Sequence, residues 1–147
     1  MNNLQFLKGF FILFMLLFTL NNYAYADCQP NIKIENFWIV QPPDIARSTA
    51  GYGVIKNMGN AADTLLKVSS NAGSVMMHKT EIKSGIAKMI HLSGKEIEAG
   101  SELVFKPMSY HLMFSDLSES IYQKGEKITL IFEFEQSGII KVEVPVR

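Results

Sequence analysis

The sequence predicts an all-β fold, a two-sheet sandwich or small barrel of Greek-key type with about eight or nine short strands. Beyond residue 31, segments of about six to nine residues alternate apolar with polar side chains, which is the period of a half-buried strand. Gly, Pro, Ser and Asn separate these segments at close spacing. Helical spacing of apolar residues is nearly absent.

The C-terminal hairpin shows the pattern most clearly. Every even-numbered residue from Ile128 to Phe134 is apolar, and the alternation resumes at residues 140–146 after the turn residues 136–138. The other strands are expected at residues 32–40, 51–57, 64–69, 75–82, 86–92, 102–106 and 109–115.

Residues 1–26 differ in kind from the rest and predict a signal peptide. Lys8 precedes an apolar run, residues 9–20, which is too short to span a bilayer as a helix. Ala24-Tyr25-Ala26 then supplies a small-x-small cleavage site. We therefore expect export to the periplasm, with an uncleaved membrane anchor as the alternative.

Residues 27–147 are expected to form one domain, because 121 residues suit a single core and are too few for two. Only Lys8 of the 14 basic residues lies before the cleavage site, which leaves 13 against 14 acidic residues. This near-neutral balance gives no footprint for nucleic acid. Cys28 is the only cysteine, so no internal disulfide can support the fold.

Histidine and methionine cluster in one part of the chain. All three histidines and five of the six methionines that follow residue 26 lie between positions 76 and 113. Methionine is a common core filler, and for any single Met that explanation is preferred. Strand alternation distinguishes core packing from a shared binding site, because residues two apart in a strand point to the same side.

In residues 110–114 the large apolar side chains take one face, so His111 and Met113 share the other. In residues 86–92, Ile86, Ile90 and Leu92 are expected on the buried face, which places Met89 and His91 on the opposite side.

Residues 75–82 and 86–92 are close enough to pair as a hairpin. A Ser84-Gly85 loop would place His78 opposite His91 and diagonal to Met89, whereas a Lys83-Ser84 loop would place it opposite Met89. A shared site further requires that the strand at residues 109–115 approaches this hairpin, which the sequence does not show.

The donor types select the metal. Thioether sulfur is soft and uncharged, so His78, Met89, His111 and Met113 suit copper(I). Zinc would need thiolate, carboxylate or more imidazole, and a blue-copper centre needs a Cys thiolate beside two His. We therefore predict one copper(I) ion at these four residues.

The spacing of the four residues also matches a family pattern. Ten residues separate His78 from Met89, twenty-one separate Met89 from His111, and one separates His111 from Met113. This spacing resembles that of the periplasmic copper chaperones called PCuAC. Lys106-Pro107 before Tyr110, and the final Val-Pro-Val-Arg, agree with that family, whereas Met108-Ser109 stands where it usually has two glycines. The resemblance covers the chain from Ile32 onward. It implies a cupredoxin-like β-sandwich that passes copper(I) toward cytochrome c oxidase, often alongside a Sco-type thiol protein.

Several residues and functions stay open. His91 is expected to support the site or simply to be exposed, Met76 to pack in the core or be exposed, and Met108 has no assigned role. Copper storage or tolerance is one alternative function, and a metal-free interaction module is another, since a sandwich fold does not fix function. An enzyme is not expected, because no nucleophile motif such as Gly-x-Ser-x-Gly occurs.

Overall fold

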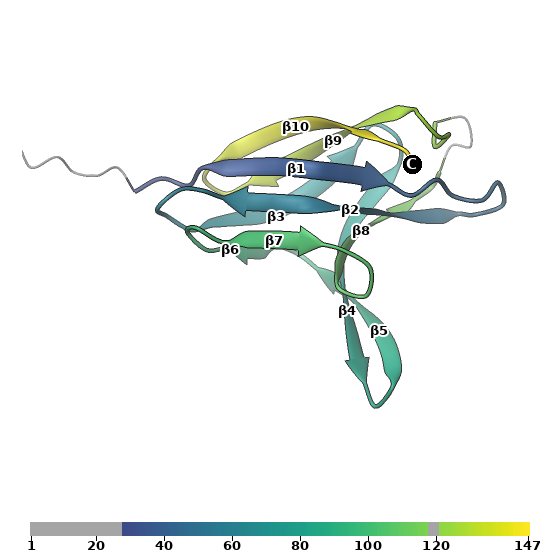
Figure 1. Cartoon of the computed structure of the whole chain (residues 1–147), viewed down its shortest axis with the longest axis horizontal. Helices are drawn as coiled ribbons and strands as arrows, with labels where there is room; N and C mark the ends of the chain where they lie inside the picture. The colour runs from purple at the N-terminus through teal and green to yellow at the C-terminus, as the bar shows by residue number, and fades with distance from the viewer. Residues whose placement is uncertain (1–27, 118–120) are drawn as a thin grey trace, which may run out of the picture.

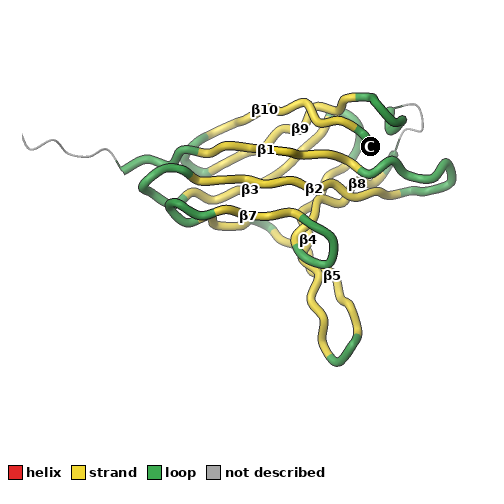
Figure 2. The backbone as a smooth tube through the Cα atoms, in the orientation of Figure 1, coloured by secondary structure: helices red, strands yellow, loops and turns green. Residues whose placement is uncertain are grey.

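The computed structural model describes residues 28–117 and 121–147, and these form a β-sandwich. The predicted signal peptide, residues 1–26, lies outside the described residues. Figure 2 shows strands and loops but no helix in the described part of the chain. Consistent with this, those residues contain no helix that is long and apolar enough to cross a membrane.

In the described part of the chain, ten strands make up the two sheets. In chain order they are β1 (Ile32–Ile39), β2 (Ser48–Asn57), β3 (Asp63–Ser70), β4 (Ser74–Lys83), β5 (Ile86–Leu92), β6 (Lys95–Ile97), β7 (Glu102–Phe105), β8 (Tyr110–Ser115), β9 (Lys127–Phe134) and β10 (Gly138–Pro145). The all-β prediction is confirmed. The strand that the sequence did not predict is β6, whose three residues are too few to show an alternating pattern.

The larger sheet has the order β1-β2-β7-β8-β4-β5, and the smaller sheet has the order β10-β9-β3-β6. β2 is long enough to pair with two strands in succession. Its residues 48–51 pair with β8, and its residues 53–56 pair with β7. β7 and β8 therefore meet beside β2, and the short turn between them lies close to the start of β8.

The core lies between the two sheets and is made from alternate residues of each. Phe37 of β1 contacts Phe105 of β7 and Phe132 of β9, with ring centroids 5.5 and 5.2 Å apart. Leu112 and Phe114 of β8 are fully buried in the same core. Because side chains alternate along a strand, burial of these two residues turns His111 and Met113 to the outside of the larger sheet.

The β4–β5 hairpin extends beyond the sandwich (Figure 1). The expectation that Ile86, Ile90 and Leu92 form a buried face is therefore wrong for Ile86, which is 71% exposed, while Ile90 and Leu92 are half-buried. The physical reason is that the tip of the hairpin has no opposing sheet to cover its inner side. Strand alternation reports which residues share a face but not whether that face is covered.

Candidate metal centre

Three strands of the larger sheet bring the histidines into one row. His78 of β4 pairs directly with His91 of β5 on one side and with His111 of β8 on the other. The ring centroids are 5.6 Å apart for His78 and His91 and 5.7 Å apart for His78 and His111. Paired residues of adjacent strands point to the same face, so all three imidazoles stand on the outside of the sheet.

The hairpin register that places His78 opposite His91 is the one with the Ser84-Gly85 loop. Lys83 pairs with Ile86, and both loop residues have positive φ, 52° at Ser84 and 78° at Gly85. Two positive φ values are the requirement of a type I′ turn, which connects hairpin strands through two residues. Met89 pairs with Thr80 and is therefore diagonal to His78, as this register predicts.

Methionines occupy the positions on either side of the histidine row. Met113 of β8 pairs with Met76 of β4, so it is diagonal to His78, and Met89 is diagonal to His78 in the opposite direction along β4. Each of His111, Met113 and Met89 thus lies one direct or one diagonal step from His78. Such steps correspond to roughly 4.5–8 Å, and the three rotatable bonds of Met allow its sulfur to bend toward a common point.

His78 and His111 differ in their hydrogen bonds. His111 is 9% exposed, and its Nδ1 donates to the carbonyl oxygen of Ser109 at 3.0 Å. Because a carbonyl can only accept, this bond fixes the proton on Nδ1 and leaves the Nε2 lone pair free for a metal. The same carbonyl accepts from the Thr80 backbone N–H at 3.0 Å, which ties this support to β4.

His78 has a buried Nδ1 with no hydrogen-bond partner. An unpaired buried nitrogen is costly, so its position in the middle of the donor cluster fits a role of His78 in binding a metal. Burial lowers the pKa of His78, and the neighbouring His111 and His91 lower it further. All three causes favour the uncharged imidazole, which is the form that binds metals.

Charged groups stand away from the donor face. Lys79, on the inner side of β4, lies 5.8 Å over the ring of Tyr110 and forms an ion pair of 3.2 Å with Glu81. Within the described ranges, no three His, Cys, Asp or Glu side chains are placed to hold a metal. The four predicted ligands combine imidazole with thioether, a donor set that suits a soft ion better than zinc, calcium or magnesium.

The turn before β8 contains the Met108-Ser109 pair. The backbone N–H of Ser109 donates to the carbonyl of Lys106, Pro107 follows Lys106, and Met108 has a φ of 60°. This is the pattern of a type II turn, in which the third residue is usually glycine. Met108 is 61% exposed and keeps a conformation that glycine would adopt without strain.

Besides the four predicted ligands, one further Met and one further His stand on the same face. Met76, for which the sequence favoured the core or simple exposure, is half-buried and directly opposite Met113. His91 is exposed at the outer end of the histidine row. Met76 is two residues from His78, and His91 is two residues from Met89. Strand alternation in the sequence therefore indicates that each pair shares a face.

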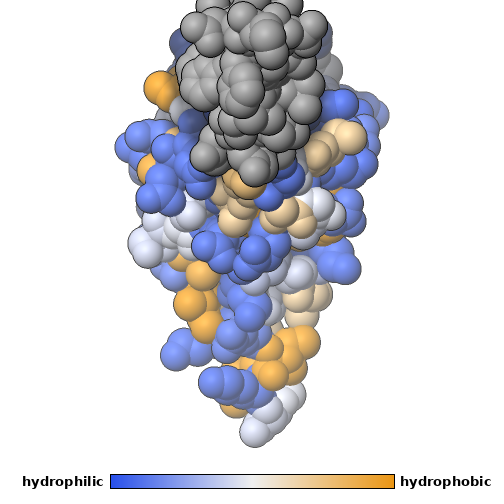
Figure 3. Space-filling view, turned by 90° about the vertical axis from the view of Figure 1, so that its left-hand side faces the viewer, coloured by the Kyte–Doolittle hydropathy of each residue, from blue (hydrophilic) through white to orange (hydrophobic). Residues whose placement is uncertain are grey.

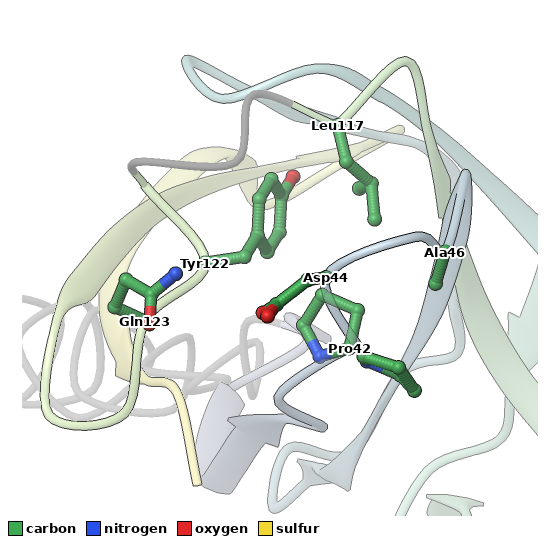
Figure 4. A pocket seen from close by; sticks show the side chains of 7 residues that line it. Pro42, Asp44, Ala46, Leu117, Tyr122 and Gln123 are labelled. Carbon is green, nitrogen blue, oxygen red and sulfur yellow. The ribbon is translucent and has the colours of Figure 1, made fainter.

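A cavity of about 420 Å³ lies elsewhere, between the loop that follows β1 and the segment that precedes β9. Figure 4 shows Pro42 and Asp44 on one side of it, with Tyr122 and Gln123 on the other. The Tyr122 hydroxyl donates to the carbonyl of Ala72 at 2.6 Å, and burial raises its pKa to about 12. None of the His or Met residues of the donor face lines this cavity.

The fold and the donor face define a β-sandwich domain that carries an uncharged nitrogen and sulfur cluster on the outside of one sheet. The chain belongs to the LpqE-like family, whose model matches residues 32–146. No curated protein matches it by sequence.

Solved structures share this fold. The copper-bound PCuAC domain from PmoF2 matches with a TM-score of 0.66 at 20% identity, covering 81% of this chain and 97% of that domain. The Cu(I) form of DR1885 from Deinococcus radiodurans matches with a TM-score of 0.64 at 21% identity, covering 84% of this chain and 83% of that one. The apo PCuAC domain from PmoF1 gives 0.63 at 18% identity, with 81% and 98% covered. At these identities the likeness shows the β-sandwich fold.

Proposed function

We propose that this protein is a periplasmic copper(I) chaperone. One copper(I) ion binds at His78, Met89, His111 and Met113 and is handed on toward the copper centre of cytochrome c oxidase, with a Sco-type protein as a further partner. The copper is cargo, and the protein catalyses no reaction of its own. Similar folds in the copper-bound domain from PmoF2 and in the Cu(I) form of DR1885 support the proposal.

The observation that carries the proposal is that His78 and His111 each have a ring nitrogen available for a metal, with thioethers close by. His111 is held by Ser109 with Nε2 free, and His78 has an unpaired buried nitrogen. Met113 and Met89 occupy the two diagonal positions around His78. Neutral imidazole and thioether form a donor set that soft copper(I) accepts and that harder divalent ions do not favour.

The same donors suit delivery of the ion. The four ligands are uncharged, so they do not neutralise the charge of copper(I) as a thiolate would. The ion is therefore easier to release. Met89 is 60% exposed, which leaves the site open to an acceptor. A thioether also resists conversion to a disulfide, which would silence a thiol ligand in an oxidising compartment.

Copper(I) titration of residues 27–147 under anaerobic conditions tests the binding. We expect one ion per chain, with both nitrogen and sulfur ligands in the X-ray absorption spectrum. Met89→Ala should weaken the affinity at least tenfold, which corresponds to about 1.4 kcal/mol. Met58→Ala is the matched control, because Met58 is 58% exposed and lies outside the donor face. A spectrum without sulfur ligands, or equal affinity in the two variants, would contradict the proposed site.

Delivery needs a separate test in cells. Deletion of the gene for this protein should lower cytochrome c oxidase assembly when copper is scarce. Expression of the wild-type protein should restore assembly, whereas expression of the His111→Ala variant should not. Normal oxidase assembly combined with poor survival at high copper would instead indicate storage or tolerance.

A further inference from the structure

His91 occupies the same relation to His78 as His111 does. Both are direct cross-strand partners of His78, and the two centroid distances, 5.6 and 5.7 Å, differ by only 0.1 Å. The difference lies in their surroundings. His111 is buried at 9% exposure and anchored to Ser109, whereas His91 is exposed.

The donor face can therefore be divided into two sets that share His78. The inner set adds His111 and Met113, which β8 holds against the body of the sandwich. The outer set adds His91 and Met89, which lie two residues apart on β5 and so point to the same side. The inner set is held by the strand with the buried residues Leu112 and Phe114, while the outer set stands on the projecting hairpin.

Among the described strands, β5 lies at the edge of the larger sheet. Exposed apolar side chains accompany Met89 on the same hairpin, with Ile82 at 61% and Ile86 at 71% exposure. Figure 3 shows hydrophobic side chains gathered on the lower projection of the molecule, where the hairpin lies in Figure 1. The outer set is therefore exposed on a part of the molecule that projects from the body of the sandwich.

We propose that His91 is a transfer ligand: a copper(I) ion held by His78, Met89, His111 and Met113 passes wholly to the outer set, His78, Met89 and His91, before release. This inference rests on the proposed copper site. The step is a ligand exchange without change of oxidation state: the bonds from His111 Nε2 and from the Met113 sulfur to copper break as a bond from a His91 ring nitrogen forms, while His78 and Met89 stay bound. One ion is involved, because the two sets share His78 and two cations so close together would repel each other.

The rate of copper(I) release tests this role. The copper(I)-loaded protein is mixed anaerobically with excess bathocuproine disulfonate, a copper(I) chelator, and release is followed by the colour of the chelate. His91→Ala should slow release about tenfold while changing the equilibrium affinity less than threefold. Lys88→Ala is the matched control, since Lys88 is an exposed residue of β5 on the opposite side from His91, and it should release at the wild-type rate.

The opposite outcomes overturn the proposal. Release from His91→Ala that is unchanged or faster means that His91 offers no path for the ion. A loss of affinity as large as that of His111→Ala means that His91 is a resident ligand and no transfer ligand. If the wild-type protein binds no copper(I), the proposed function itself fails, and that result appears in the loading step before any release is measured.

Discussion

Asn57, at the end of β2, offers a sharp test of how this sandwich is held together. Its side chain is 1% exposed and satisfies all of its hydrogen-bonding capacity within the protein. Nδ2 donates to the carbonyls of Ala61 at 2.7 Å and Ile97 at 3.1 Å. Oδ1 accepts from the backbone N–H groups of Asn31 at 3.1 Å and Gly59 at 3.0 Å. One side chain thereby joins β2 to the chain before β1, to the loop before β3 and to β6.

Asn57→Ala removes these four bonds and leaves their partners to find water. Each bond contributes about 0.5–1.5 kcal/mol net, and buried partners that stay unpaired cost more. Some partners are only partly buried and can be rehydrated, so the expected loss in the free energy of unfolding is about 3 kcal/mol. That is a large share of the roughly 5–15 kcal/mol that stabilises a domain, and it corresponds to a fall in Tm of roughly 10 °C.

Urea denaturation followed by circular dichroism measures this loss. Asn60→Ala is the control, because exposed Asn60 accepts one hydrogen bond, from the Gln29 N–H at 2.9 Å, and its loss should cost less than about 0.5 kcal/mol. Copper(I) affinity should stay unchanged in Asn57→Ala, because Asn57 lies at the far end of β2 from residues 48–51, which pair with β8. A loss below about 1 kcal/mol, or one equal to that of Asn60→Ala, would refute the reasoning.

Three further predictions concern the scaffold. A Cβ on Gly53 would overlap the Phe37 ring, so Gly53→Ala should lower the free energy of unfolding by about 2 kcal/mol or more in urea denaturation, and a neutral result would contradict the close contact. Met108→Gly relieves a positive φ and should raise Tm slightly, by the equivalent of about 0.5 kcal/mol, whereas a lower Tm would show that the Met side chain stabilises the turn. Burial raises the pKa of Asp63, but hydrogen bonds from Ser137, Gln136 and Thr64 outweigh it and lower the pKa below its usual 3.8. The resulting stabilisation is present above that value and is lost as pH falls through the lower folded-state pKa, so the stability advantage over Asp63→Asn should shrink as the pH falls below 3.8, and an advantage that did not change with pH would contradict this account.

The local parts of the fold were predictable from the sequence. Alternation in residues 127–135 and 140–146 predicted β9 and β10, and the structure confirms the hairpin. The Ser84-Gly85 loop was one of two registers that the residues allowed, and only the paired strands decide between them. β6 was missed because its three residues carry no detectable period.

The candidate site was predictable only in part. Alternation placed His111 with Met113 and Met89 with His91, and the structure confirms both placements. The role of His78, Met89, His111 and Met113 as copper ligands stays a prediction. Met76 was assigned to the core or to exposure because a single Met gives no sign of what lies opposite it, and the structure places it across from Met113.

Which side chains share a face could be predicted from the sequence alone, because the alternation of a strand is a local property of a few residues. The chemistry of the donors could be predicted as well, because it depends on residue type alone. The folded chain was needed to show that β8 lies beside β4, joining residues more than thirty positions apart, and that the tip of the hairpin is exposed. Those contacts depend on how two whole sheets pack around Phe37, Phe105 and Phe132, and no local pattern encodes that packing.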